Sequence, residues 1–333
     1  MDFYLGSPRP NAVVRRWTFV SFSRSARVLS SSLELLGALR PTPLVMLPKI
    51  SEYGTAIWAK LEFFNPFSRS IKDRAAAYML TNAIKRTGAT RFYEATSGNL
   101  GVALAALAAA HGVKFRAYVP RTVSQTVISL MRILGAEVVV MEADEVSDEV
   151  MEAARMDAER DGAVYLDQHH NEDNPRGQET LADELRDQLR MSGLEPTAVV
   201  AGTGSLGHLT ALGKLRDEMG FELIAARPAE GERIPGLRRD WKRRMVADEV
   251  VDVTLEEAME AAISVARMEG LAIGPSSGAA VAAALKAARK RGGDYIVILP
   301  DDATKYVDMF NKYLEKFGDK GPTYRGPRTG HNP

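Results

Sequence analysis

The residue with the clearest chemical potential is Lys72, in the stretch NPFSRSIKDR at 65–74. The apolar run AIWAKLEFF precedes this stretch, and the alanine-rich segment AAAYMLTNAIKR follows it. This change of pattern predicts that Lys72 lies in the first turn of a helix that ends near Arg86. A lysine is usually a solvated surface residue, and the stretch alone favours that explanation. Partial burial would instead lower the pKa of the amine and prepare it for Schiff-base chemistry with a carbonyl group.

Two glycine-containing loops follow predicted strands and could bind anions. TSGNLG at 96–101 offers two hydroxyls, an amide and a helix N-terminus to a carboxylate, although helix capping alone explains such residues. GTGSLG at 202–207 opens a helix, and its backbone amides could hold a phosphate. The same loop fits G-x-G-x-x-G, and Glu222 lies 20 residues after Gly202, as in dinucleotide-binding proteins. A nicotinamide-dependent oxidoreductase is therefore an alternative from a different class.

Two further loops place polar residues after apolar segments. GPSSG at 274–278 precedes a helix, so Ser276 could cap that helix or hydrogen-bond a buried ring nitrogen. DDATKY at 301–306 follows the run IVILP, and its spacing indicates no mechanism of its own. None of the five histidines pairs with acidic residues at ligand spacing, so the sequence predicts no metal site.

The elements that must position these loops alternate between strand-like and helical patterns from about residue 44 to residue 300. Predicted strands include 90–96, 114–120 and 163–168, each followed by a helical segment. Such alternation predicts an α/β fold with two open, mostly parallel twisted sheets flanked by helices. Ligands of such sheets bind at loops after the carboxyl ends of strands, which is where the four polar loops lie.

Composition excludes several classes of protein. The 333 residues carry 43 basic and 43 acidic side chains, so the formal net charge is zero and neither nucleic acid nor an anionic membrane is an expected partner. Cysteine is absent, which excludes disulfides and thiolate sites and fits a cytoplasmic protein. No apolar run approaches the roughly 20 residues that span a bilayer. The first 33 residues contain five arginines, seven serines and one acid, which is typical of a transit peptide or of an arm that packs on the body or on a second subunit; we favour the arm.

Five motifs agree in order and kind with one known family. SIKDR is similar to S-x-K-D-R around a Schiff-base lysine, TSGNLG to T-S-G-N-T-G, GTGSLG to G-T-G-G-T, GPSSG to G-x-S-S-G and DDATKY to D-x-G-x-[KR]-Y. Over roughly 40–316 the chain therefore resembles the cysteine synthase and cystathionine β-synthase family of fold-type II pyridoxal-phosphate enzymes, in particular its O-phosphoserine sulfhydrylase-like members.

The resemblance implies a tryptophan synthase β-like architecture, with pyridoxal 5'-phosphate in the cleft between two domains, and a homodimer. The domains that we expect are an N-terminal arm, a larger phosphate-binding domain, a smaller substrate-loop domain and a loose tail. Their expected bounds are 1–40 for the arm, 41–66 with 177–318 for the larger domain, 67–176 for the smaller domain and 319–333 for the tail.

The resemblance also implies a role for each motif residue. Lys72 would hold the cofactor as a Schiff base and move the Cα proton, Asn99 would bind the 3′ oxygen of the cofactor, and Ser276 would face its pyridine nitrogen. A neutral serine stabilises a protonated pyridine less well than a carboxylate would, which favours short-lived carbanions and β-elimination. The phosphate would be held by Gly202, Thr203, Gly204, Ser205 and Leu206, and the substrate carboxylate by Thr96, Ser97, Asn99 and Gln168.

The implied reaction is a β-replacement that makes L-cysteine from an O-activated serine and sulfide through an aminoacrylate intermediate. The stretch 234–244 contains five cations and could be an ordinary solvated surface. It resembles the segment that places an arginine over the substrate phosphate, and the matching residue is Arg238, so we expect O-phosphoserine to be preferred. The alternatives are O-acetylserine as substrate and cystathionine β-synthase activity.

Four departures from the family pattern bear on the substrate more than on the cofactor. One extra residue lies near Arg69, Leu100 replaces a threonine, Ser205–Leu206 replaces Gly-Thr and Ala303 replaces a glycine.

Overall fold

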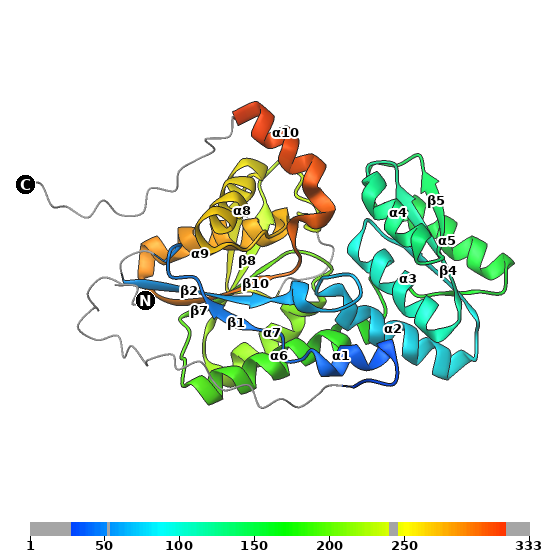
Figure 1. Cartoon of the computed structure of the whole chain (residues 1–333), viewed down its shortest axis with the longest axis horizontal. Helices are drawn as coiled ribbons and strands as arrows, with labels where there is room; N and C mark the ends of the chain where they lie inside the picture. The colour runs from blue at the N-terminus through cyan, green and yellow to red at the C-terminus, as the bar shows by residue number, and fades with distance from the viewer. Residues whose placement is uncertain (1–27, 52–53, 240–245, 318–333) are drawn as a thin grey trace, which may run out of the picture.

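The computed structural model describes residues 28–51, 54–239 and 246–317. The predicted short strand or docking segment at 17–22 and the predicted loose tail at 319–333 lie outside these residues. Helices and strands form two bodies, each built on its own sheet (Figure 1). The predicted fold class, with two mostly parallel sheets flanked by helices, is confirmed.

The larger sheet has six strands in the order β1-β2-β10-β7-β8-β9. All neighbours are parallel except β1, which runs antiparallel to β2. In chain order the strands are β1 (Leu44–Met46), β2 (Thr55–Leu61), β7 (Ala198–Gly202), β8 (Glu222–Pro228), β9 (Glu249–Val253) and β10 (Gly293–Leu299).

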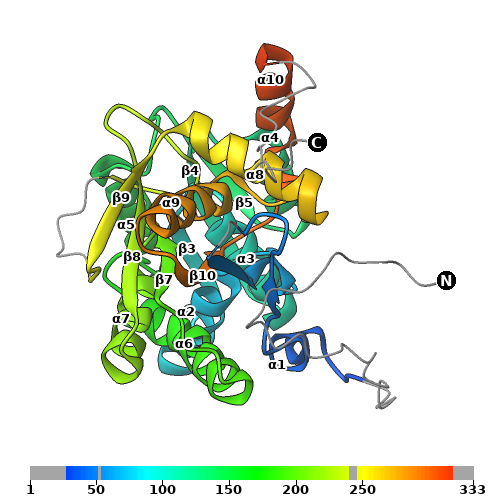
Figure 2. The ribbon, with the colours of Figure 1, turned by 90° about the vertical axis from the view of Figure 1, so that its left-hand side faces the viewer.

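Helices cover both faces of this sheet, as the end-on view of Figure 2 shows. The cluster on one face contains alanines and valines of α8 (Leu255–Glu269) and α9 (Pro275–Arg291). The cluster on the other face contains leucines of α6 (Asp173–Ser192) and α7 (Gly207–Met219). The central strands β7 and β10 are apolar on both sides because both of their faces are buried.

The smaller sheet has four parallel strands in the order β5-β4-β3-β6. The strands are β3 (Arg91–Ala95), β4 (Lys114–Pro120), β5 (Glu137–Met141) and β6 (Val164–Tyr165), and the helices are α2 (Lys72–Thr87), α3 (Asn99–His111), α4 (Gln125–Ile133) and α5 (Asp148–Arg160). Side chains that alternate along β3 separate its two faces: Phe92 packs with α2 and α3, whereas Tyr93 packs with α5.

Several elements differ from the sequence-based expectation. Strand β9 and the helix α10 (Val307–Phe317) were not predicted, and β6 is much shorter than the expected strand at 163–168. The described part of the predicted arm contains η1 (Ser32–Glu34) and α1 (Leu35–Ala38), and Leu33 and Leu36 pack on the core of the smaller sheet. The remaining short helices are η2 (Glu62–Phe64) and η3 (Ala303–Tyr306). The exact domain bounds stay a prediction.

A buried charge network holds α2 against the larger body. The guanidinium of Arg74 donates to Glu62 at 2.6 and 2.9 Å and to Glu184 at 2.7 and 2.8 Å. Lys60 also pairs with Glu184, at 3.0 Å. Close contact is possible because residue 177 on α6 is glycine: a Cβ there would lie 2.4 Å from the carbonyl oxygen of Arg74. The first turn of α2, which carries Lys72, is therefore fixed relative to β2 and α6.

Candidate active site

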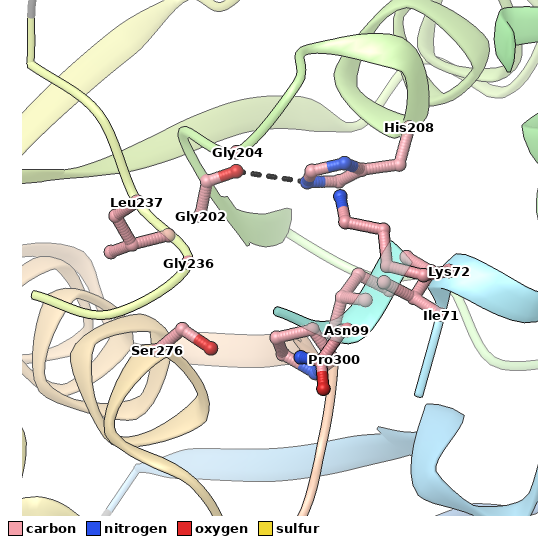
Figure 3. Close-up of a pocket in the computed structure, with 11 residues that line it drawn as sticks. Ile71, Lys72, Asn99, Gly202, Gly204, His208, Gly236, Leu237, Ser276 and Pro300 are labelled. Atoms are coloured by element: carbon pink, nitrogen blue, oxygen red, sulfur yellow. Dashed lines mark hydrogen bonds between the residues drawn. The ribbon is translucent and has the colours of Figure 1, made fainter. Parts of the chain in front are cut away.

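A pocket lies where β7 and β10 end and α2 begins (Figure 3). It brings together five of the predicted cofactor residues, contributed by both bodies of the molecule. Its lining consists of Ile71, Lys72, Asn99, Gly202, Gly204, His208, Gly236, Leu237, Ser276, Ile298 and Pro300. The loops that the sequence analysis selected thus meet at one place, as expected for the carboxyl ends of parallel strands.

Lys72 is the first residue of α2, as predicted, and its side chain is half-buried. The N–H of Ile71 donates to the carbonyl oxygen of Pro300 at 2.8 Å, which attaches the start of α2 to the end of β10. Burial lowers the pKa of Lys72 to about 8, although the Asp301 carboxylate opposes this shift. Among the described residues, the amine forms no hydrogen bond and no ion pair within 4 Å. Such an amine is more often deprotonated at neutral pH than an exposed lysine, and so is a better nucleophile.

The Gly202–Leu206 turn leads from β7 into α7. No hydrogen bond among the described residues uses the N–H groups of Ser205, Leu206 or Gly207, which stand at the positive end of the helix dipole. Leu206 has a left-handed backbone, with φ of +62°, which is strained for a leucine. These amides form a cradle for a phosphate.

The other predicted phosphate residues are engaged within the turn itself. The N–H of Thr203 donates to the carbonyl oxygen of Ala226 at 2.9 Å, and its hydroxyl donates to that of Arg238 at 2.6 Å. The N–H of Gly204 donates to the carbonyl oxygen of Gly202 at 3.0 Å. A Cβ on Gly204 would lie 3.2 Å from the Gly236 carbonyl oxygen, so glycine keeps the cradle open.

His208 was not selected from the sequence, although it directly follows the glycine loop. Its Nε2–H donates to the carbonyl oxygen of Gly202 at 2.8 Å, and its ring lies beside the amine of Lys72 (Figure 3). Burial and the charge of Lys72 lower the pKa of His208 to about 4. The imidazole is therefore neutral at neutral pH and adds no competing positive charge beside the amine.

Asn99 and Ser276 lie at the other end of the pocket. Asn99 Nδ2 donates to Asp301 Oδ2 at 2.7 Å, whereas its buried Oδ1 has no hydrogen-bond partner among the described residues. Ser276 is the second residue of α9, and its hydroxyl donates to Asp301 Oδ1 at 3.4 Å. A buried carboxylate thus stands behind both residues, which the sequence analysis did not anticipate.

The predicted substrate-carboxylate residues do not line the pocket, apart from Asn99. Thr96 is buried, and its hydroxyl accepts the N–H of Gly101 at 3.1 Å, as in ordinary helix capping. Ser97 is exposed on the same loop. Gln168 is buried, and its Nε2 donates to the carbonyl oxygen of Ala95 at 2.9 Å, which ties it to the strand before the loop.

Arg238 directly follows the pocket residue Leu237 and connects the two bodies. Its N–H donates to the carbonyl oxygen of Thr203 at 2.8 Å, and its Nη2 donates to that of Val146, which precedes α5, at 2.8 Å. A second missed residue, His169, lies near this arginine: burial, then the charges of Arg238 and Lys72, lower its pKa to about 4. The neighbouring His170 instead contacts Asp167 at 2.9 Å.

The geometry contradicts the nicotinamide-dependent alternative. The acidic residue of the dinucleotide fingerprint must reach a ribose near the glycine loop, at the carboxyl end of the next strand. Glu222 is the first residue of β8 and pairs in register with Ala198, whereas Gly202 pairs with Ala226. At about 3.3 Å per residue, Glu222 lies more than ~10 Å from the glycine loop, at the opposite edge of the sheet. It forms an ion pair with Arg291 there.

Within 28–51, 54–239 and 246–317, no group of three or more His, Asp or Glu side chains is arranged to hold a metal ion. In the same ranges no helix combines the length and the apolar character that a membrane span needs.

Comparison with known proteins agrees with this site. The profile of the family described as "Pyridoxal-phosphate dependent enzyme" matches residues 35–301. Cysteine synthase B of Salmonella typhimurium is 35% identical over 282 residues, which cover 80% of this chain and 91% of that protein. A probable cysteine synthase of Bacillus subtilis is 31% identical over 295 residues, covering 82% and 93%.

Solved structures give the same result. The crystal structure of an O-ureido-L-serine synthase superposes with a TM-score of 0.80 at 28% identity, covering 89% of this chain and 98% of that one. A cysteine synthase from Entamoeba histolytica superposes with a TM-score of 0.76 at 26% identity, covering 97% and 96%.

The residues present fit pyridoxal phosphate. The pocket offers an amine of lowered pKa, a cradle of unused backbone N–H groups, a buried serine hydroxyl and an amide oxygen without a partner. The family profile and the cysteine synthases each match about four fifths of the sequence. The chain belongs to the family of pyridoxal-phosphate dependent enzymes.

Proposed function

We propose that this protein makes L-cysteine by β-replacement, from an O-activated serine and sulfide, with O-phosphoserine as the preferred substrate. The observation that supports the reaction class best is Lys72, whose amine lies in the pocket with a pKa lowered to about 8. Cysteine synthases are among the proteins that this chain resembles over most of its length.

Bound pyridoxal phosphate would supply an aldehyde for the amine of Lys72 and an electron-withdrawing ring that acidifies the Cα–H of an amino acid. The N–H groups of the Gly202–Leu206 turn would hold the phosphate, and Asn99 and Ser276 would orient the ring. Lys72 would take the Cα proton at its Nζ and later return it. His208 would keep its neutral ring against Lys72 during both transfers.

The substrate carboxylate would bind the loop that contains Thr96, Ser97 and Asn99, with Gln168 beside it. In the structure Thr96 and Gln168 shape this loop through hydrogen bonds to backbone groups. The exposed Ser97 and the N-terminus of α3 are the groups that we expect to contact the carboxylate directly.

The leaving group would bind near Arg238. This residue is bonded to the Gly202–Leu206 turn through Thr203, its guanidinium reaches Val146 of the smaller body, and it directly follows Leu237 of the pocket. A guanidinium recognises a dianionic phosphate with charge-assisted, bidentate hydrogen bonds. An acetyl group carries no charge and would gain little from the same residue. Arg69, which pairs with Asp302 at 2.6 Å, is not needed for this role.

The substrate preference can be tested with two adjacent arginines. Arg239 donates to the carbonyl oxygen of Pro228 and pairs with Asp252 at 3.2 Å, so Arg239→Ala is a matched control for Arg238→Ala. We expect Arg238→Ala to lower kcat/KM for O-phosphoserine by about 10- to 100-fold, the value of one charge-assisted contact, and to change that for O-acetylserine little. The Arg239→Ala variant should affect both substrates equally.

Two outcomes would contradict the phosphate preference. One is a wild-type enzyme that uses O-acetylserine better than O-phosphoserine, and the other is an equal loss for both substrates in Arg238→Ala. Cystathionine β-synthase activity, the remaining alternative, predicts that homocysteine replaces sulfide as the nucleophile, which the same assay measures directly.

The assembly and location that we propose are a cytoplasmic homodimer with small-molecule substrates only. The absence of cysteine supports the location, and the zero formal net charge supports the absence of a nucleic-acid partner. The homodimer is proposed from the family resemblance alone. Light scattering of the purified full chain measures the oligomeric state.

A further inference from the structure

Glu94 is a fully buried acid that stands just before the loop expected to hold the substrate carboxylate. It lies on β3, on the same side of the strand as Phe92, because side chains two residues apart share a face. Phe92 packs in the apolar core that β3 forms with α2 and α3. The role of Glu94 was not predicted from the sequence, and the proposed mechanism does not use it.

Glu94 takes part in an exchange of hydrogen bonds at the end of β6. The N–H of Leu166 donates to the carbonyl oxygen of Tyr93 at 3.0 Å, as in a regular parallel ladder. If the ladder continued, the N–H of Gln168 would donate to the carbonyl oxygen of Ala95. It donates instead to Glu94 Oε2 at 3.3 Å, while the side-chain Nε2 of Gln168 donates to the carbonyl oxygen of Ala95 at 2.9 Å. Two side chains thus replace a bond between two backbones.

The exchange explains why β6 is shorter than the predicted strand at 163–168. Asp167 has a left-handed backbone, with φ of +51°, which turns the chain just before Gln168. Gln168 is also held from its other side, because its carbonyl oxygen accepts Asn174 Nδ2 at 2.8 Å. Asn174 lies in the first turn of α6. Gln168 is therefore fixed between the strand that leads into the substrate loop and the start of a helix that covers the larger sheet.

The surroundings of Glu94 favour its neutral form. Burial raises the pKa of Glu94 well above its usual range, and the charge of Asp167 raises it further, while hydrogen bonds from Gln168 and from the N–H of Ala95 lower it. Asp167 and Tyr165 are its titratable neighbours on β6 and the loop after it. The second oxygen, Oε1, is buried and has no hydrogen-bond partner among the described residues. A charged oxygen without a donor is costly at such a place, whereas a neutral acid can keep its proton there.

We propose that Glu94, as a neutral carboxylic acid, is a positioning residue for the substrate carboxylate. It holds Gln168 beside the loop at 96–99 and adds no negative charge there. An ionised Glu94 would repel a bound carboxylate through a site of low dielectric. This inference rests on the part of the proposed function that places the substrate carboxylate at this loop, and not on the choice of leaving group.

The first test measures binding at the loop without turnover. L-Alanine, which has no leaving group, and L-alaninamide, which has no carboxylate, are titrated separately into the holoenzyme, and the change in cofactor absorbance gives their dissociation constants. We expect Glu94→Ala to weaken binding of L-alanine by about 10-fold, the value of one hydrogen bond, and to change that of L-alaninamide little. Glu94→Gln keeps an uncharged acceptor for the N–H of Gln168, so it should bind both compounds as the wild type does.

The pair of compounds separates a positioning role from a merely structural one. An unchanged constant for L-alanine in Glu94→Ala, equal weakening of both compounds, or a Glu94→Gln variant as weak as Glu94→Ala would each overturn the proposal. The matched control is Glu137→Gln, the same change at an exposed position of the same sheet, where the carboxylate pairs with Arg116. It should leave both constants unchanged. A wild type that binds neither compound would contradict the amino-acid site on which this inference depends.

A second measurement uses the apoprotein and decides the ionisation of Glu94. Between the usual pKa of 4.5 and the raised value, folded Glu94 keeps a proton that the unfolded chain loses, so its contribution to stability falls as pH rises. Glu94→Gln has no such proton. Chemical denaturation should therefore show the variant gaining stability relative to the wild type as pH rises above 4.5, by up to about 10-fold in the folding equilibrium per pH unit.

Two results of this measurement would contradict a neutral Glu94. One is a difference between the two proteins that stays constant with pH, and the other is a Glu94→Gln variant that fails to fold, since an amide should replace a neutral acid. The outcome is independent of substrate preference. If Arg238→Ala fails to discriminate the two activated serines while Glu94 behaves as expected, the leaving-group proposal fails and the role of Glu94 stands.

Discussion

Lys72, which is half-buried, and Arg74, which is fully buried, are two cations only two residues apart on α2, and their surroundings shift their pKa values in opposite directions. Arg74 meets two carboxylates with short hydrogen bonds, and its pKa is raised. Lys72 has no contact of this kind among the described residues, and its pKa is lowered to about 8. Because residues i and i+2 point to different sides of a helix, one turn carries both environments.

The difference shows that a cation with close carboxylate partners and a cation without them serve different purposes. Burial alone would raise the pKa of Glu184, yet Arg74 and Lys60 lower it to about 2, so that network stays ionised across the physiological range. Such a network holds α2, β2 and α6 in place, and its protonation state does not change during catalysis. The charge of Lys72 is left without a close partner, and its proton can therefore be exchanged near neutral pH.

The largest expected effect is that of Lys72→Met on activity. Removing the amine removes the group that we propose to bind the cofactor and to move the proton, so we expect turnover to fall by at least ~10²- to 10⁴-fold. The free energy of unfolding at neutral pH should not fall, because no close ion pair is lost and the cost of burying the charged amine is removed. Steady-state assays and chemical denaturation measure the two quantities. A variant that keeps substantial turnover would show that Lys72 is not the catalytic amine.

The next largest effect is that of Arg74→Met on stability. This change leaves Glu62 and Glu184 buried without their main partner, and we expect it to lower the free energy of unfolding by about 3–5 kcal/mol. Arg155→Ala is the control, since its pairs with Glu152 and Glu159 are exposed and should contribute at most ~1 kcal/mol. Equal losses in the two variants would mean that the buried network is no more important than a surface pair.

The apoprotein should show a pH dependence of stability that belongs to Lys72. Its folded pKa of about 8 lies below the usual 10.5, so between these values the unfolded chain binds a proton that the folded chain does not. Stability contributed by this group therefore rises with pH from about 8 to about 10.5. Thermal unfolding of the wild type and of Lys72→Met over this range isolates the contribution. A constant difference between the two proteins would contradict the lowered pKa.

The smallest expected effect is that of Gly204→Ala on cofactor affinity. The added methyl group would lie 3.2 Å from the Gly236 carbonyl oxygen and 3.6 Å from Lys72 Nζ, so it narrows the cradle without entering the core. We expect weaker cofactor binding by roughly 10-fold, or about 1.4 kcal/mol, with the fold intact. Fluorescence titration of the apoprotein measures this affinity. Gly213→Ala, on the far side of α7 against Val246, should leave it unchanged.

Sequence patterns predicted the fold well wherever periodicity was strong. The strand at 114–120 and the helix from Lys72 were predicted nearly to the residue, because each has a clear period and an end marked by proline or glycine. Strand β9 was missed because acidic residues interrupt its short apolar run, EVVDV. Helix α10 was missed because the stretch DDATKY before it has the composition of a loop.

Motif order located most of the candidate site, but side-chain partners could not be predicted. Asp301 lies more than 200 positions from Asn99 and 25 from Ser276, and only the fold brings the three together. Spacing likewise gave no reason to place His208 beside Lys72. The position of its ring depends on one hydrogen bond, from Nε2–H to the carbonyl oxygen of Gly202, and no local sequence pattern predicts that bond.

Helix α2 lies between the two bodies: its start is bonded to the larger sheet through Ile71 and Pro300, one side packs on α6, and its apolar face packs in the core of the smaller sheet. If one body rotated relative to the other, the rotation axis would therefore lie near this junction, and atoms close to the axis would move least. The hydrogen bond between Arg238 and Val146, which joins the two bodies, would break and form again, while the amine of Lys72 stayed almost still. A substrate could thus be admitted and released without disturbing the atom that must remain aligned.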